Sequence, residues 1–241
     1  MIAAHPEADL AVFPELFLSG YTLAPTRGLA RGCASALEAV AGQAAQTRTA
    51  VAIGFAEEWQ GGIANAVALL DTDGRAVGTY RKTHLFSGER EAYRAGDRQL
   101  VVRLANRLVA PLVCFDVEFP EPARAVARAG AELLAVVSAN MEPYAAEHEL
   151  LTRARALENR LPLVYVNCVG SERGFRFVGG SRVVAGDGRV VAQLSDAEEE
   201  TRVVEIPARP VDAAAAYLRQ LGGELPVDRP DLTPSEAGGT A

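Results

Sequence analysis

Short apolar runs recur along the chain, and turn residues or alanine-rich stretches separate them. Runs rich in β-branched residues predict strands, whereas apolar residues repeated at intervals of about 3.6 predict helices. The predicted strands cover residues 9–13, 51–55, 64–70, 76–80, 100–104, 108–114, 132–137, 163–166, 178–184, 190–194 and 203–206. The predicted helices cover residues 30–47, 120–130, 144–160 and 213–221, and residues 1–8 have the pattern of a helix end. Strands that alternate with helices predict an α/β layer protein with a mixed sheet.

The connections agree with this arrangement. Asp73-Gly74 and Asp187-Gly188 are typical of tight hairpin turns, and residues 87–96 are polar and loop-like. Pro111 lies inside a predicted strand, where it removes a hydrogen-bond donor. No linker divides the chain, and 241 residues suit one large domain. We therefore expect a single domain over residues 1–221 and an extended or disordered tail over residues 222–241.

Charge and cysteine content narrow the functional classes. A net charge of −7 without a basic block argues against nucleic acid and anionic membranes as partners, and no apolar run is long enough to span a bilayer. The three cysteines (Cys33, Cys114 and Cys168) are far apart, which favours a reducing cytoplasm over a disulfide framework. Neither the cysteines nor the isolated histidines have the spacing of zinc ligands, so we expect no metal site.

Cys114 ends an apolar run and is followed by charged residues, by Pro120 and by an alanine-rich helical pattern. A strand that delivers a cysteine to a sharp turn before a helix is good geometry for a nucleophile, because the next backbone N–H groups point into the same space. A lone cysteine is more often an inert core residue. This stretch alone therefore leaves both interpretations open.

Glu15 and Lys82 also lie where apolar strands end, and strand ends in a layered α/β fold converge on one crevice. A carboxylate there could take the proton of a thiol, and an ammonium could stabilise an oxyanion while the thiolate attacks a carbonyl group. Taken singly, Glu15 could be a helix cap and Lys82 a solvated surface charge. The combination is what points to nucleophilic catalysis.

Three stretches resemble, in order, the motifs of the nitrilase (carbon–nitrogen hydrolase) superfamily. They are DLAVFPELFLSGY from Asp9 to Tyr21, YRKTHLF from Tyr80 to Phe86, and CFDVEFPE from Cys114 to Glu121. The third is most similar to amidase-type members and less similar to true nitrilases. The likeness covers about residues 8–206 and continues through residues 138–144, 153–159 and 179–181.

This resemblance implies an α-β-β-α sandwich with a Glu-Lys-Cys triad. Glu15 would be the general base and Cys114 the nucleophile. Lys82 and the backbone N–H of Phe115 would stabilise the oxyanion. The implied reaction is hydrolysis of a small carboxamide through a cysteine thioester, with release of ammonia, then attack by a water that Glu15 activates. It needs no cofactor, and we expect a homodimer or a larger homo-oligomer.

The resemblance also implies supporting residues. A second glutamate that positions the amide would be Glu89, with Glu91 as the competing choice, and His84 would be structural. Asn140, Met141 and Tyr144 could line the substrate pocket. Arg153 and Glu158 would brace the pocket, or they could form a plain ion pair.

Two further readings of the sequence stay open: an N-carbamoyl-amino-acid (ureide) hydrolase with the same triad, and a non-catalytic family member. The second gains weight because the strand and most of the helix with which the family begins, ahead of Asp9, are absent here. We expect this absence to leave an unpaired strand edge and to lower stability.

Overall fold

The computed structural model describes residues 2–209, so the predicted helix over 213–221 and the predicted tail over 222–241 lie outside the described residues. The helices described are η1 (Ile2–Ala4), α1 (Arg27–Thr47), α2 (Glu89–Ala92), η2 (Cys114–Glu118), α3 (Pro120–Arg128) and α4 (Ala145–Asn159). Of these, η1, α2 and η2 are single turns, whereas α1, α3 and α4 match helical patterns read from the sequence.

Two sheets form the centre of the molecule. The first has the order β1-β2-β3-β4, with β1 parallel to β2 and the other pairs antiparallel. Its strands are β1 (Leu10–Val12), β2 (Ala50–Trp59), β3 (Gly62–Leu70) and β4 (Ala76–Arg81). The second has the order β12-β11-β8-β7-β6-β5, with β6, β7 and β8 parallel. Its strands are β5 (Val102–Leu104), β6 (Arg107–Val113), β7 (Leu133–Ser138), β8 (Leu163–Asn167), β11 (Arg182–Val184) and β12 (Val190–Gln193).

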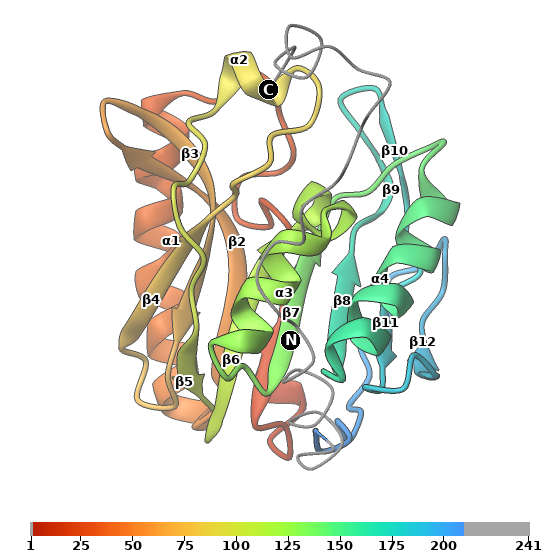
Figure 1. The fold of residues 1–241 in the computed structure, drawn as a ribbon. Coiled ribbons are helices and arrows are strands. Elements are labelled where there is room, and N and C mark those ends of the chain that lie inside the picture. The colour runs from red at the N-terminus through yellow and green to blue at the C-terminus, as the bar shows by residue number, and fades with distance from the viewer. Residues whose placement is uncertain (1, 210–241) are drawn as a thin grey trace, which may run out of the picture.

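The two sheets face each other, and helices cover their outer faces (Figure 1). Val67 and Leu69 of the first sheet pack against Val113 and Val137 of the second. A second apolar cluster lies between α1 and the first sheet, and a third lies between the second sheet and the pair α3 and α4. Three apolar interfaces between four layers define the α-β-β-α sandwich that the resemblance implied.

Several predicted elements differ in the structure. The stretch 178–184 is not one strand, because Gly179 and Gly180 adopt positive φ and separate β10 (Phe175–Val178) from β11. Strand β10 pairs with β9 (Val169–Glu172), which the sequence pattern did not predict. The predicted loop 87–96 contains α2, and residues 1–8 contain only the short η1.

Pro111 is compatible with β6 because of where the neighbouring strand ends. Strand β5 pairs with residues 107–109 only, so Pro111 has a strand neighbour on the β7 side alone. A proline costs little where a strand edge needs no donor.

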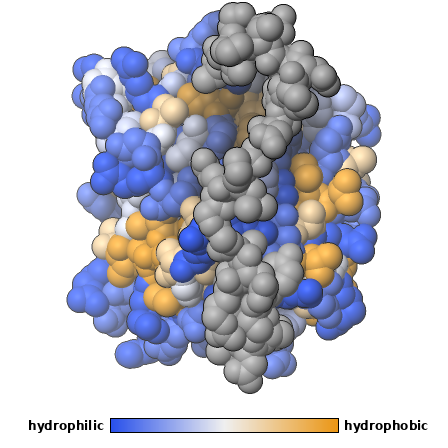
Figure 2. All heavy atoms as spheres, viewed as in Figure 1, coloured by the Kyte–Doolittle hydropathy of each residue, from blue (hydrophilic) through white to orange (hydrophobic). Residues whose placement is uncertain are grey.

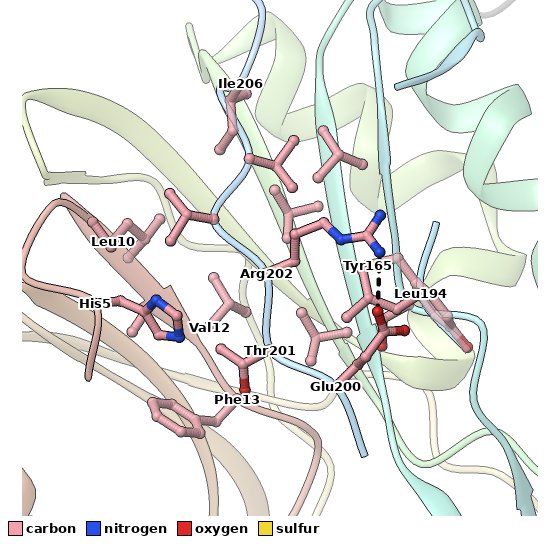
Figure 3. Close-up of a pocket in the computed structure, with 18 of the residues that line it drawn as sticks. His5, Leu10, Val12, Phe13, Tyr165, Leu194, Glu200, Thr201, Arg202 and Ile206 are labelled. Atoms are coloured by element: carbon pink, nitrogen blue, oxygen red, sulfur yellow. Dashed lines mark hydrogen bonds and ion pairs between the residues drawn. The ribbon is translucent and has the colours of Figure 1, made fainter. Parts of the chain in front are cut away.

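Residues 203–206, predicted as a strand, have no regular secondary structure and belong to neither sheet. Arg107 ties them to the fold by donating to the carbonyl oxygens of Ile206 and Pro207. Between this segment and β1, which is the end strand of its sheet among the described residues, lies a cavity of about 1030 Å³ (Figure 3). Leu10 and Val12 lie on one side of it and Arg202 and Ile206 on the other. None of the residues predicted to be catalytic lines this cavity.

The face of the molecule in Figure 2 is hydrophilic over most of its area, with hydrophobic residues gathered in separate patches. Among residues 2–209, no helix combines the length and the apolar character that crossing a membrane requires.

Candidate active site

Cys114 lies at the turn between β6 and the single-turn helix η2. Its backbone is left-handed, with φ of 44°, which is unfavourable for a residue that carries a Cβ. Strain of this kind persists where the surrounding fold fixes it, and it is concentrated at functional sites. The first N–H groups of a helix have no acceptor within the helix, so the turn also presents donors beside the thiol.

Glu15, Lys82 and Glu89 form one buried ionic cluster. The ammonium Nζ of Lys82 donates to Oε1 of Glu15 at 2.7 Å and contacts Oε2 of Glu89 at 2.8 Å. All three side chains are almost completely shielded from solvent, with at most 1% of their surface exposed. Because an unpaired buried charge is very costly, each member depends on the others. The competing candidate, Glu91, is exposed at the surface.

Neighbouring groups fix both carboxylates. Glu15 accepts from the Asn65 amide at 2.6 Å and from the backbone N–H of Ala139 at 2.8 Å. Glu89 accepts from the Tyr21 hydroxyl at 2.9 Å and from the backbone N–H of Phe86 at 2.8 Å. These bonds hold the carboxylates in place before any substrate arrives. Asn65 is not among the residues predicted from the sequence, although a polar residue inside an apolar strand is a recognisable signal.

The cluster keeps Lys82 charged. Burial by itself lowers the pKa of Lys82, but the carboxylates of Glu15 and Glu89 outweigh it and hold that pKa well above its usual value. Burial raises the pKa of Glu89; Lys82 opposes this shift and the charge of Glu15 adds to it. The site therefore carries a fixed cation between two carboxyl groups.

The surroundings keep Cys114 protonated at rest. Burial and the charge of Glu15 raise the pKa of the thiol well above its usual value, while Lys82 and a hydrogen bond from Ser138 act in the opposite direction. A thiol in this state is a weak nucleophile and needs a base to remove its proton during attack.

Asp116, which is not among the site residues predicted from the sequence, joins the Lys82 loop to the Cys114 turn. Its carboxylate accepts from the backbone N–H of Val113 at 3.0 Å and of His84 at 2.9 Å, and from the hydroxyl of Tyr80 at 2.8 Å. The His84 ring contacts the same carboxylate at 2.9 Å. His84 thus has the structural contact expected of it.

A small cavity of about 10 Å³ lies against Cys114. The expected pocket residues Phe115, Asn140, Met141 and Tyr144 all line it. Phe86 makes edge-to-face contacts with the rings of Phe115 and Tyr144, which gives the cavity an aromatic wall. The side-chain amide of Asn140 donates to the carbonyl of Tyr144, so it shapes the loop.

The prediction that Arg153 pairs with Glu158 or braces the pocket with it is wrong about the arginine. Arg153 donates to the carbonyl of Gly188, away from the site. Arg155 instead pairs with Glu158 at 3.1 Å and donates to the carbonyl oxygens of η2 residues 117 and 118. Residues two positions apart point to nearly opposite sides of a helix, so the difference decides which arginine supports the turn at Cys114.

The α-β-β-α sandwich places a thiol at a strained strand end, beside a buried cluster of two glutamates and a lysine. This arrangement is typical of a hydrolase that uses a cysteine nucleophile. The family model for carbon-nitrogen hydrolases matches residues 1–216, and the chain belongs to that family. Membership makes it an enzyme that cleaves carbon–nitrogen bonds.

Relatives of known activity agree. An (R)-stereoselective amidase from Pseudomonas sp. is 39% identical over 213 residues, which are 86% of this chain and 76% of that protein. The omega-amidase YafV of Escherichia coli K12 is 32% identical and covers 81% of this chain and 75% of its own length.

Among solved structures, the NitN amidase from Nesterenkonia sp. AN1 superposes with a TM-score of 0.80 at 30% identity, covering 91% of this chain and 85% of its own. A mutant of that amidase, with a TM-score of 0.75, 30% identity and coverage of 81% and 78%, carries the acetamide moiety of fluoroacetamide covalently on its active-site cysteine.

Proposed function

We propose that this protein hydrolyses small carboxamides through a thioester on Cys114, with Glu15, Lys82 and Glu89 as the other catalytic residues. The observation that carries the proposal is the buried contact of Lys82 with both carboxylates, in a site where Lys82 and Cys114 line the same cavity. The covalent cysteine adduct of the Nesterenkonia amidase supports the same chemistry.

In the first half-reaction, Glu15 takes the proton of Cys114 as the sulfur attacks the amide carbon. The carbonyl oxygen becomes an oxyanion, which Lys82 and the backbone N–H of Phe115 stabilise. The C–N bond then breaks, and the protonated Glu15 donates its proton to the departing nitrogen, so that ammonia leaves. The high pKa of the Cys114 thiol requires such a base.

In the second half-reaction, water attacks the thioester carbonyl. Glu15 takes a proton from the water, and the same oxyanion donors act again. The C–S bond then breaks to release a carboxylic acid, and Glu15 donates its proton to the sulfur, which restores the Cys114 thiol. Glu89 orients the substrate. Its carboxylate accepts hydrogen bonds from Tyr21 and Lys82, and it can accept a further hydrogen bond from the amide nitrogen of the substrate.

The size of the space beside the sulfur indicates small acyl groups. A cavity of about 10 Å³ holds roughly one water molecule. A larger acyl group requires Phe86, Met141 or Tyr144 to move, and these apolar side chains favour an uncharged acyl chain.

The test is ammonia release from a panel of aliphatic amides, amino-acid amides, nitriles and carbamoyl compounds. We expect release from short amides, and a loss of about 10²–10⁴-fold in kcat for Glu15→Gln, which removes proton transfer. Release of carbon dioxide together with ammonia from carbamoyl compounds alone would instead identify a ureide hydrolase. An active Cys114→Ala variant would refute the thioester route.

We further propose a cytoplasmic location and a homodimeric or larger assembly. Three free cysteines among the described residues support a reducing compartment. Leu150 and Leu157, which share one face of α4, are 66% and 44% exposed and support an interface there. Light scattering on the purified protein, compared with a Leu150→Asp/Leu157→Asp variant, tests the assembly; a monomer for the unaltered chain contradicts it.

A further inference from the structure

A second set of polar side chains reaches the thiol. The Tyr165 hydroxyl donates to Oγ of Ser138 at 3.1 Å, and Nδ1 of His148 contacts the same hydroxyl at 2.9 Å. Nε2 of His148 lies 3.3 Å from Oε1 of Glu118. Ser138 and Cys114 each follow directly on a register pair of neighbouring strands, Val137 of β7 and Val113 of β6, so the serine lies beside the cysteine. These side chains come from β7, β8, α4 and η2, which the fold brings together behind the nucleophile.

The set is buried and is separate from the ionic cluster. Ser138, Tyr165 and His148 are at most 2% exposed, and only Glu118, at the far end, reaches solvent. Among the described residues, no side-chain hydrogen bond links Ser138, Tyr165 or His148 to the cluster of Glu15, Lys82 and Glu89. Removal of the thiol proton by Glu15 does not use these side chains, so their buried connection toward Cys114 needs another explanation.

The direction of each hydrogen bond follows from what its neighbour can do. Oγ of Ser138 accepts from the Tyr165 hydroxyl and from the backbone N–H of Asn140, so its own proton is left for the sulfur. Tyr165 gives its proton to Ser138 and must accept one from Nδ1 of His148. Nε2 of His148 faces Oε1 of Glu118 at 3.3 Å, which fixes the orientation of the imidazole ring.

The donors therefore run from Nδ1 of His148 through Tyr165 and Ser138 toward the sulfur, and Glu118 faces the other ring nitrogen of His148. Two arginines lie near this set of side chains, Glu118, His148, Tyr165 and Ser138, which we call the relay. The guanidinium of Arg182 of β11 lies 5.5 Å from the ring centroid of Tyr165, and Arg155 donates to the backbone carbonyl of Glu118 at 2.7 Å. Every buried polar atom in such a chain is satisfied, and each bond polarises the next.

We propose that Glu118, His148 and Tyr165 are positioning residues that hold the Ser138 hydroxyl as a donor to the Cys114 sulfur. This hydrogen bond stabilises the sulfur most when the sulfur carries negative charge, which is while Cys114 loses its proton to Glu15 and again while the thioester breaks. The relay itself transfers no proton. The inference rests on the proposed function in taking Cys114 as the nucleophile.

Alkylation of Cys114 by iodoacetamide, followed on its own peptide by mass spectrometry between pH 7 and pH 10, tests the relay without amide turnover. Ser138→Ala should slow alkylation at pH 8 about tenfold or more, since a hydrogen bond to a charged group is lost. Tyr165→Phe should slow alkylation about three- to tenfold and shift the dependence of the alkylation rate on pH to higher pH. Both should lower kcat with little change in KM.

The matched control is Tyr93→Phe, which removes another buried tyrosine hydroxyl, one that donates to the carbonyl of Thr22. It should leave the alkylation profile unchanged. If Tyr165→Phe does not fold, Glu118→Gln, at the exposed end, should give a smaller shift in the same direction. Unaltered alkylation profiles for Tyr165→Phe and Glu118→Gln overturn the relay. Turnover by Cys114→Ala would overturn the proposed function instead, so the two failures are distinguishable.

Discussion

Replacing Lys82 with methionine should destabilise the protein far more than replacing its neighbour in the sequence, Arg81. The substitution keeps most of the side-chain volume and removes only the ammonium group. Glu15 and Glu89 would then face each other in a site with at most 1% exposure, without the cation that both now contact.

The magnitude follows from burial. Removing one partner of a buried ion pair costs about 3–5 kcal/mol, because the remaining charge is left uncompensated. A domain has a total stability of only about 5–15 kcal/mol, so the variant should unfold at much lower urea concentration. Arg81 pairs with Glu57, and those side chains are 25% and 21% exposed. Such a pair is worth about 1 kcal/mol or less.

The loss of unfolding free energy caused by Lys82→Met should grow as pH rises. Two carboxylates without a cation raise each other's pKa, so the folded variant binds a proton that the unfolded chain releases above about pH 4.3. The unfolding free energy then falls with pH by up to about 1.4 kcal/mol per unit. The difference from the unaltered protein should therefore be larger at pH 7 than at pH 5.

Urea unfolding at both pH values measures this, with Arg81→Met as the control. Adding Glu89→Gln to Lys82→Met should restore part of the stability and none of the activity. A Lys82→Met protein as stable as Arg81→Met at pH 7, or a loss that shrinks as pH rises, would refute the buried cluster as described.

Further predictions concern the second glutamate and Cys168. Glu89→Gln should lower kcat/KM at least about tenfold, since it weakens a charged hydrogen-bond network, while Glu91→Gln should match the unaltered enzyme in initial-rate assays; the reverse pattern would reassign the role. Burial raises the pKa of Cys168 to about 12. The stability that its neutral thiol contributes is therefore complete below about pH 9 and is lost between about pH 9 and pH 12, as the unfolded thiol ionises first. Cys168→Ala should lessen the fall in unfolding free energy between pH 8 and pH 10, and an identical slope would contradict the shift.

The sequence was most informative where chemistry and local pattern coincide. Apolar runs that end in Glu15, Lys82 and Cys114 predicted three strand ends at one site, and the structure brings Glu15 and Lys82 into contact there. Glu89 was separable from Glu91 only by motif likeness, because both lie in the same short polar stretch. Burial of one and exposure of the other follow from the single turn of α2.

What the sequence could not predict depends on long-range geometry. The split between β10 and β11 depends on the conformation of two glycines. The relay joins residues 118, 138, 148 and 165, which lie on four separate elements, and no local period marks them as partners. The segment 203–206 has a strand pattern, yet pairing needs a neighbouring strand, which the described residues do not supply.

The central claim is that Cys114 carries the acyl group. Intact-mass spectrometry of the protein quenched during turnover of a slow amide tests it most directly. We expect a mass increase equal to the acyl group, located on the Cys114 peptide, absent from Cys114→Ala and retained in a Cys33→Ser/Cys168→Ser variant. Turnover without any adduct on Cys114, or an adduct that persists in Cys114→Ala, would contradict the account.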